Sequence, residues 1–370
     1  MAELEILRPE QQARWIEVLQ SSFQHDFYHL PQYQALAEER GEGKAHLFLY
    51  TEGRYFVAIP LLLRPIDSVV CHVQTGKGWW DATSVYGYVG PIASHANVPE
   101  SVLHNFRSAL SRTLQERRIV AVFSRLHPLI PQQGLLAGLG EFISVGPTVS
   151  IDLTLSVDVQ RARYRKSHRY DIAKLRRSGV TCLHDREKAS LDEFTEIYYG
   201  TMHRVNASAT YFFEHSYFER LVSALESQMH LFVCMLDGSV ICGGLFALCD
   251  GIVQFHLGGT RNEFFASSPM KLLLDEVRLW ANERQARVFH LGGGVGAQGD
   301  ALFHFKAGFT DRRHEFTIWR WVLLPDVYDR LCEEKIRCSR QLGLDPVGNG
   351  FFPAYRCPEC LETKDVQLFS

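Results

Sequence analysis

Residues 288–309 read VFHLGGGVGAQGDALFHFKAGF. A β-branched and aromatic run at 288–291 is followed by a glycine-rich stretch and then by an aromatic segment that carries Lys306. This pattern is typical of a strand that ends in a loop of bare backbone, followed by a short helix or turn. Two interpretations remain open. The loop and Lys306 can form a ligand site, because glycine backbone presents N–H groups closely, or the glycines can simply make a tight turn beside a surface lysine.

The composition describes an ordinary globular protein. The chain has 370 residues, of which 46% are hydrophobic and 22% charged, and this length has room for two domains. No apolar run reaches the length needed to span a bilayer, and residues 1–5 lack the features of a signal peptide. We therefore expect a cytoplasmic protein without a membrane span.

The nine cysteines do not form a disulfide framework, because their number is odd and their spacing irregular. Cys357 and Cys360 make a lone CxxC pair, whereas a tetrahedral zinc site needs four ligands. No metal site is therefore predicted.

Charge is concentrated in one segment. Between Arg161 and Arg177 there are eight basic residues and one acidic residue, in a chain whose net charge is −3. An apolar stripe through Tyr164, His168 and Leu175 predicts a helix over 158–177 with a wide cationic face. Such a face is either simply solvated or binds a polyanion such as RNA. The candidate nucleic-acid-binding residues are Arg161, Arg165, Lys166, Arg169, Arg176 and Arg177.

The order of elements indicates a duplicated α/β (α+β) fold. Asp237-Gly238 and Asp250-Gly251 separate three strand-like runs, which predicts an antiparallel meander, and a helix from Pro269 to Arg284 crosses to the strand at 287–291. The first half repeats this outline more weakly, with a hairpin at Gly53. We predict two tandem domains, each a mixed, largely antiparallel sheet flanked by helices. Residues 1–147 form the first, with 319–370 as a candidate completion, and residues 148–318 form the second.

Four stretches carry further information: Tyr86–Pro91, Leu175–Val180, Met202–Arg204 and the Phe-Lys-x-Gly-Phe element Phe305–Phe309. In these stretches the chain resembles the Fem-type (FemAB/FemX-like) branch of the GNAT acyltransferase superfamily. The resemblance extends to about residue 330 and implies two GNAT-like domains that transfer an acyl or aminoacyl group to an amine. Two features depart from the pattern: the segment 260–270 lacks the glycines of a GNAT pyrophosphate loop, and residues 33–39 lack a lysine found in members that act on peptidoglycan.

The resemblance also implies roles for individual residues. Lys306 would hold the polarised acyl carbonyl or the donor's terminal group. Arg204 would bind phosphates of the acceptor, and the basic helix would face the backbone of an aminoacyl-tRNA. The first domain would be the acceptor side and the second the donor side. The other candidate substrate-binding residues are Trp80, Tyr86, Tyr88, Gly293 and Gly294.

Amide formation from an activated ester or thioester needs a neutral amine, an electrophilic carbonyl and stabilisation of the oxyanion. Lys306, beside Phe305, is the strongest candidate for the oxyanion. His256 and Asp300 are candidate bases. A strand histidine is more often a core residue than a catalyst, however, and water is an alternative base.

Three functions fit the sequence. The first is an N-acyltransferase that joins an activated acyl group, aminoacyl from aminoacyl-tRNA, to a primary amine on a small or sugar-linked acceptor. The second is an acyl-CoA-dependent GNAT N-acetyltransferase. The third is a non-catalytic RNA- or polyanion-binding module on a degenerate acyltransferase scaffold. None requires a permanently bound cofactor, since aminoacyl-tRNA or acyl-CoA would be a co-substrate, and the sequence indicates no oligomeric state.

Overall fold

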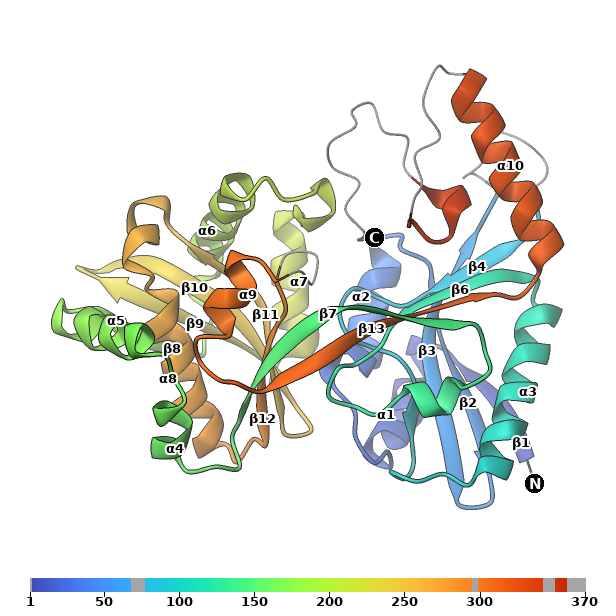
Figure 1. Ribbon diagram of the computed structural model, residues 1–370, viewed down its shortest axis with the longest axis horizontal. Helices are drawn as coiled ribbons and strands as arrows, with labels where there is room; N and C mark the ends of the chain where they lie inside the picture. Colours follow the sequence, from blue (N-terminus) through green and yellow to red (C-terminus); the bar gives the residue numbers. More distant parts are fainter. Residues whose placement is uncertain (1, 68–76, 295–298, 342–349, 358–370) are drawn as a thin grey trace. The chain divides into compact units, whose positions relative to one another are not determined.

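A computed structural model describes residues 2–67, 77–294, 299–341 and 350–357 (Figure 1). The chain divides into two compact units, which are treated separately below. Unit 1 comprises Met1–Val145 and Phe316–Ser370, and unit 2 comprises Gly146–Glu315. Strands β7 (Glu141–Asp152) and β13 (Arg313–Val322) carry the chain from one unit to the other. No helix within the described residues is long and apolar enough to cross a membrane.

Unit 1 is built on a sheet with strand order β1-β2-β3-β4-β6-β13, in which β4 and β6 are parallel and the other neighbours antiparallel. The short strand β5 pairs with β3. Its strands other than β13 are β1 (Ala2–Leu7), β2 (Lys44–Glu52), β3 (Tyr55–Pro65), β4 (Trp80–Thr83), β5 (Ile92–Ala93) and β6 (Ile119–Arg125). Its α-helices are α1 (Gln12–Gln20), α2 (Pro31–Glu39), α3 (Glu100–Glu116) and α10 (Pro325–Gln341).

The core of unit 1 follows from these patterns. Helix α3 buries Val102, Phe106 and Leu110 at intervals of four residues, which places them on one side of the helix against the sheet. Late in the chain, residues 350–357 return to the same unit. The buried carboxylate of Asp81 accepts hydrogen bonds from Arg64 (2.7 Å), Tyr355 (3.1 Å) and Arg356. This ion pair attaches the C-terminal segment to β4.

Unit 2 has the strand order β7-β12-β11-β10-β9-β8, and its one parallel pair within that order is β11 with β12. The predicted mixed, largely antiparallel sheet is therefore confirmed. Its further strands are β8 (Thr181–Asp185), β9 (Met229–Leu236), β10 (Ser239–Cys249), β11 (Ile252–Thr260) and β12 (Val288–Gly292). Its α-helices are α4 (Val157–Ala162), α5 (Lys166–Arg177), α6 (Leu191–Arg204), α7 (His215–Leu225), α8 (Met270–Glu283) and α9 (Ala301–Lys306).

The meander β9-β10-β11 has the two hairpins that the sequence predicts. Asp237, Gly238, Asp250 and Gly251 all have positive φ, as the tight turns between antiparallel strands require. Helices α6 and α8 cover opposite faces of this meander. Cys242 packs in the core with α8, whereas a Cβ on the next residue, Gly243, would lie 2.8 Å from the Phe194 ring of α6, and successive strand residues point to opposite faces.

The basic segment forms two helices, α4 and α5, rather than the single helix predicted over 158–177. The backbone of Arg165 is extended (ψ 147°), and its N–H donates to Gly308 O at 2.8 Å. The helix is therefore interrupted between Ala162 and Lys166, where the Arg165 amide bonds Gly308 in the segment after α9.

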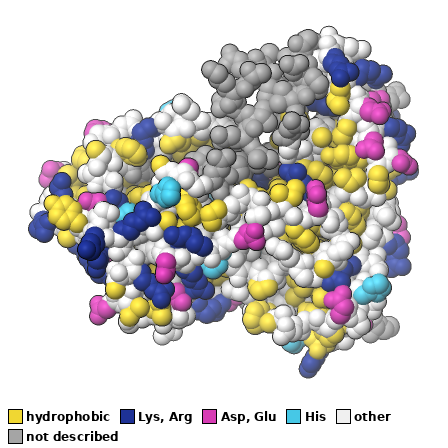
Figure 2. All heavy atoms as spheres, viewed as in Figure 1, with side chains coloured by type: hydrophobic (Ala, Val, Ile, Leu, Met, Phe, Trp, Pro, Cys, Tyr) yellow, Lys and Arg dark blue, Asp and Glu magenta, His cyan; other side chains and the backbone are white. Residues whose placement is uncertain are grey.

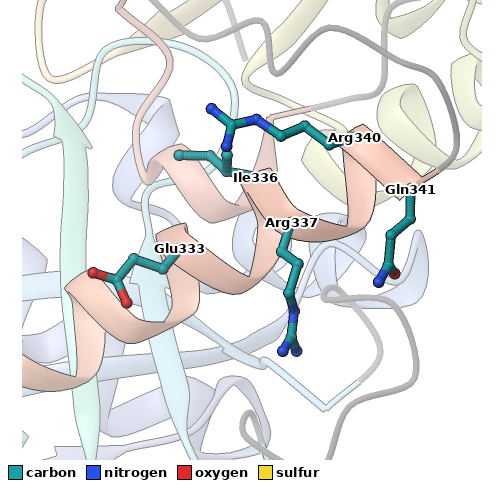
Figure 3. A pocket seen from close by; sticks show the side chains of 5 residues that line it. All are labelled: Glu333, Ile336, Arg337, Arg340 and Gln341. Atoms are coloured by element: carbon teal, nitrogen blue, oxygen red, sulfur yellow. The ribbon is translucent and has the colours of Figure 1, made fainter.

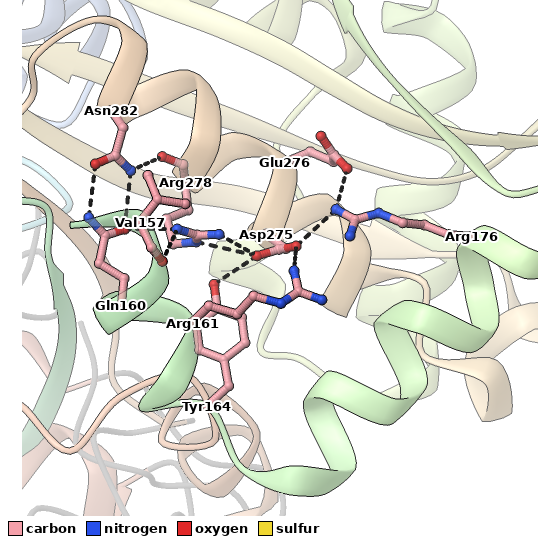
Figure 4. A network of polar contacts seen from close by, with 9 residues as sticks. All are labelled: Val157, Gln160, Arg161, Tyr164, Arg176, Asp275, Glu276, Arg278 and Asn282. Carbon is pink, nitrogen blue, oxygen red and sulfur yellow. Dashed lines mark hydrogen bonds and ion pairs between the residues drawn. The ribbon is translucent and has the colours of Figure 1, made fainter.

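A buried carboxylate fastens these two helices to α8 (Figure 4). Asp275 accepts hydrogen bonds from Arg161 of α4 (3.1 Å), Arg176 of α5 (3.0 Å) and Arg278 of α8 (2.9 Å). The hydroxyl of Tyr164 also donates to Asp275, at 3.1 Å. Asp275 and Arg278 are both fully buried, so each charge depends on its partners, because water does not reach them.

Replacing Asp275 with Ala should lower the free energy of unfolding by about 3–5 kcal/mol, since it leaves Arg278 buried without a counter-ion. Asp171→Ala is the matched control. It removes a carboxylate from the same helix layer, but Asp171 is partly exposed in its pair with Lys271, so the loss should be at most about 1 kcal/mol. Urea unfolding followed by far-ultraviolet circular dichroism measures both. Equal midpoints for the two variants would contradict this role for Asp275.

Candidate functional site

The strands β11 and β12 diverge at their carboxyl ends. Their parallel pairing joins Ile252–Gln254 to Val288–His290, whereas β11 runs on to Thr260 and β12 ends at Gly292. The opposite edge of β11 carries a bulge at this point: Leu245 faces Leu257 and Phe246 faces Phe255, so His256 is an extra residue. Carboxyl ends of parallel strands are where α/β folds bind ligands, and bulges re-aim groups beside such sites.

Lys306 enters this region from α9. The helix starts at Asp300, whose carboxylate caps it by accepting the N–H of Phe303 at 2.8 Å. At the other end of α9, Lys306 Nζ donates to Gly293 O at 2.7 Å and lies 5.7 Å from the centre of the Phe255 ring. The side chain is only 8% exposed. The short helix α9 thus places the Lys306 ammonium group beside Gly293, the residue that follows β12.

Burial lowers the pKa of Lys306 to about 8, and the nearby charge of Asp300 acts in the opposite direction. The amine is therefore mostly protonated at neutral pH. An ammonium group has three N–H donors, of which Gly293 O takes one. A fixed donor in a poorly hydrated site stabilises a developing oxyanion far better than the same group in water.

The Phe305–Phe309 element has a structural reason for each of its main positions. The carbonyl of Phe305 accepts the Nε2–H of His168 at 2.9 Å, and the two rings lie 5.7 Å apart. A Cβ on Gly308 would lie 2.2 Å from His168 Nε2, so glycine is required for α5 to dock here. Phe309 enters the core beside Tyr164. Sequence reasoning placed His168 in the apolar stripe of the basic segment but did not link it to this element.

The two candidate bases have different surroundings. Burial lowers the pKa of His256 to about 3, so its imidazole is neutral and a weak proton acceptor. Asp300 is committed to capping α9, and its charge favours the protonated form of Lys306. A direct catalytic role for either residue stays a prediction.

Arg204 is held by protein groups. Its guanidinium donates to Thr260 O at 3.0 Å and to the side chain of Asn262, and it lies 4.5 Å from the centre of the Phe265 ring. The predicted phosphate contact therefore competes with bonds that fix the segment between β11 and α8. That phosphate-binding role stays a prediction.

The start of α8 follows this segment and offers little to an anion. Pro269, before the first helical residue, has no N–H. The amides of Lys271, Leu272 and Leu273 donate to the carbonyls of Ser268 and Pro269 at 3.0–3.1 Å. The sequence indicated no glycine-rich pyrophosphate loop at 260–270, and three backbone N–H groups at the start of the helix are already bonded to the protein.

Trp80, Tyr86 and Tyr88 belong to unit 1. Trp80 begins β4 and packs against the core. Tyr86 O accepts the hydroxyl of Tyr33 at 3.0 Å, and the Tyr88 ring contacts Phe316 edge-on at 5.1 Å. The loop that carries both tyrosines packs closely on Tyr28, because a Cβ on Gly87 would lie 2.0 Å from the Tyr28 ring.

A buried polar cluster supports this loop and escaped sequence reasoning. Asp26 and His127 are fully buried in their side chains and lie 2.9 Å apart. His127 Nδ1 accepts the N–H of Leu129 at 3.1 Å, so its Nε2 carries the hydrogen that Asp26 accepts. Gln132 donates to Val89 O (2.6 Å) and Pro91 O (2.9 Å). The residues of this cluster are far apart in the chain, and no local pattern joins them.

Unit 2 therefore brings together Lys306, Phe305, Asp300 and Gly293 at the end of β12, with Gly294 following. Residues 295–298 of the glycine-rich stretch lie outside the described residues. Of the six candidate nucleic-acid-binding residues, Arg161 and Arg176 are tied to Asp275, and Arg165 donates to His304 O at 3.1 Å. Lys166, Arg169 and Arg177 form no ion pair within the described residues, and Figure 2 shows lysines and arginines gathered on this part of the surface.

A surface hollow of about 480 Å³ on α10 is a weaker candidate. Figure 3 shows its labelled side chains, which all come from one helix and point in different directions. Among the described residues, the cluster with metal-like spacing is Asp192, His215 and Glu219, all exposed. Cys357 is buried, and Cys360 lies outside the described residues.

Comparisons with known proteins agree with this geometry. Residues 162–307 match the acetyltransferase (GNAT) domain family. FemX is similar in structure, with a TM-score of 0.67 and 14% identity over 89% of this chain and 99% of its own. The C-terminal domain of a putative lysylphosphatidylglycerol synthetase from Agrobacterium fabrum has a TM-score of 0.52 and 14% identity over 89% and 96%. L-PGS from Bacillus licheniformis has a TM-score of 0.50 and 14% identity over 85% and 91%.

No curated protein matches the chain in sequence. The predicted tandem GNAT fold is confirmed by the structural matches and by the matched domain.

The depressed pKa of Lys306 predicts a specific dependence of stability on pH. The folded value of about 8 lies below the ordinary 10.5, so between these two pH values the unfolded chain binds more protons than the folded one. Stability attributable to Lys306 should therefore rise with pH through this window, by about 3 kcal/mol in total, and be lowest below pH 8. The measurement is the difference in unfolding free energy between the wild type and Lys306→Met from pH 7 to 10.5. A difference that stays constant would contradict the buried ammonium.

Proposed function

We propose that this GNAT-type acyltransferase joins an activated aminoacyl group to a primary amine, with Lys306 stabilising the oxyanion. The observation that carries the proposal is the Lys306 ammonium, held 2.7 Å from Gly293 O where β11 and β12 diverge. A lysine is rarely buried unless it is paired or functional. Here its polar partner is a backbone carbonyl, which leaves N–H donors for a substrate.

The reaction needs no covalent intermediate on the protein. The neutral amine attacks the carbonyl carbon of the aminoacyl ester, so a C–N bond forms and the carbonyl oxygen becomes an oxyanion. Lys306 donates to that oxygen. The oxyanion then collapses, the C–O bond to the carrier breaks, and the proton released by the amine neutralises the departing alkoxide. Asp300 supports this step by favouring the charged form of Lys306.

Two features of unit 2 favour a tRNA donor over coenzyme A. The amides of residues 271–273 at the start of α8 are bonded internally, and Arg204 is bonded to Thr260 and Asn262, so the usual means of holding a pyrophosphate at a helix start is reduced. The surface of α5 is cationic, as a phosphate backbone requires. The Fem-type resemblance, and relatives whose name describes attachment of a lysyl group to phosphatidylglycerol, support aminoacyl transfer.

For the acceptor we propose a small or sugar-linked primary amine, with unit 1 as the acceptor side. The loop that carries Tyr86 and Tyr88, together with Trp80, would bind it. Gly293 and Gly294 would line the path to Lys306, because glycine lets the backbone approach a substrate closely.

A second candidate function is acetyl-CoA-dependent N-acetylation. The observation that favours it is the matched domain itself, which is described as an acetyltransferase. Lys306 would have the same role toward a thioester carbonyl, so the two functions differ in their donor rather than in their catalytic group.

Replacing Lys306 with Met should reduce kcat at least 100-fold, the effect of losing one oxyanion donor, with little change in KM for the donor. Single-turnover transfer of a radiolabelled aminoacyl group from charged tRNA to an amine pool measures it. Lys306→Arg is the conservative partner, and it should recover part of the activity because it keeps the charge. A fully active Lys306→Met enzyme would refute the role, whereas RNA binding without transfer by the wild type would favour a non-catalytic RNA-binding function.

The donor should be decided by direct competition. We expect mass spectrometry to detect an aminoacylated amine after incubation with charged tRNA, and calorimetry to detect no binding of acetyl-CoA. Acetylated amine together with saturable acetyl-CoA binding would instead establish the second function. Uncharged tRNA is the control, since it should bind without yielding product.

A further inference from the structure

The exposed face of α5 carries one aromatic residue among cations. Lys166, Tyr170 and Lys174 recur every four residues and Arg177 follows three later, so the four lie within about 80° around the helix axis. The buried residues His168, Ile172 and Leu175 occupy the opposite side. Tyr170 is 63% exposed. We call Lys166, Tyr170, Lys174 and Arg177 the Tyr170 stripe.

The stripe differs from the rest of the basic segment in how its charges are used. Arg161 and Arg176 neutralise Asp275, and Arg163 lies 3.6 Å from Asp311. Within the described part of the chain, no ion pair involves Lys166, Lys174 or Arg177. The stripe's three cations are therefore available to external anions, whereas the arginines beside them hold the unit together.

We propose that the Tyr170 stripe binds single-stranded RNA, with Tyr170 stacking on an unpaired base and the three cations contacting phosphates. This inference rests on the proposed tRNA donor and names the part of it that is recognised, the unpaired 3′ end. Alternating cations and an exposed aromatic ring match a single strand, whose bases are free to stack. A duplex presents phosphates alone to such a surface.

The position of the stripe agrees with this role. Its first residue, Lys166, follows Arg165, whose N–H donates to Gly308 O, two residues after Lys306. The stripe is about 16 Å long at 1.5 Å per residue, which is room for a few unstacked nucleotides. A strand lying on it would thus lead toward the segment that carries the catalytic lysine.

A membrane surface is the main competing ligand for a basic helix. An interfacial helix inserts a continuous apolar face, but the apolar face of α5 is buried in unit 2 and the stripe offers one ring. The observations therefore favour RNA.

The test is fluorescence anisotropy with two labelled RNA hairpins, one with an unpaired 3′ tail and one blunt. The wild type should prefer the tailed hairpin. Tyr170→Ala should weaken its binding to the tailed hairpin about tenfold or more and remove the preference, while Tyr170→Phe should keep both because it retains the ring. Phe23→Ala, at a similarly exposed aromatic in unit 1 (57%), is the matched control and should change nothing.

The role of the three cations is tested separately, by the salt dependence of RNA affinity. Replacing Lys166, Lys174 and Arg177 together with Ala should lower the slope of log affinity against log salt by about 2, at about 0.7 per phosphate on a single strand. Arg186→Ala, which removes an exposed cation outside α5, should leave the slope unchanged. Thermal unfolding of every variant should match the wild type, since none of the substituted side chains is buried.

Equal affinity of the wild type and Tyr170→Ala for the tailed hairpin would overturn the stripe, as would no RNA binding by the wild type. So would binding to phosphatidylglycerol vesicles in preference to RNA. The proposed aminoacyl transfer is measured in a separate assay. If Tyr170→Ala loses the preference for the tailed hairpin but the wild type transfers no aminoacyl group, the aminoacyl function is refuted and the stripe is not. If the wild type transfers the group but Tyr170→Ala binds RNA as the wild type does, the stripe is refuted and the aminoacyl function is not.

Discussion

The site in unit 2 depends on keeping a positive charge in a place that water scarcely reaches. Moving an ammonium group out of water is costly, and the pKa of Lys306, lowered to about 8, reflects that cost. Gly293 O, the Phe255 ring and the charge of Asp300 offset part of it. All three require α9 to dock at the end of β12. Because Gly308 has no side chain, α5 packs closely through His168 on the segment that carries Lys306.

The same constraint explains why the basic segment is not simply a basic surface. A buried aspartate is tolerated only with partners, and Asp275 takes three of them as arginines and one as a tyrosine. Asp81 in unit 1 has a similar set, with two arginines and Tyr355. Arg161 and Arg176 of the basic segment therefore stabilise the fold by neutralising Asp275. What remains for a ligand is a narrower set of side chains than the composition of 161–177 indicates.

Local sequence patterns were enough to predict those elements whose structure depends on residues a few positions apart. The Asp-Gly hairpins, the crossover helix and the strand before the glycines were predictable because turn residues and periodicity act within a few positions. Lys306 was identifiable through its motif. Arg161 and Arg176 lie about a hundred positions from Asp275 in the chain, and His127 lies as far from Asp26. Tertiary packing brings such pairs together, so a short stretch of sequence cannot reveal them. The break between α4 and α5 belongs to the same class, because Gly308 O is what the Arg165 amide pairs with.

The bulge at His256 shows how the two kinds of information combine. A sequence pattern identifies β11 as a strand, but the pattern does not reveal that the ladder with β10 gains a residue there. Phe255, which precedes the extra residue, has its ring centre 5.7 Å from Lys306 Nζ. A ring face attracts a cation without accepting its protons. Phe255 thus helps to hold the ammonium in place while leaving its N–H donors for the acyl oxygen of the proposed reaction, whereas a carboxylate at the same position would occupy them.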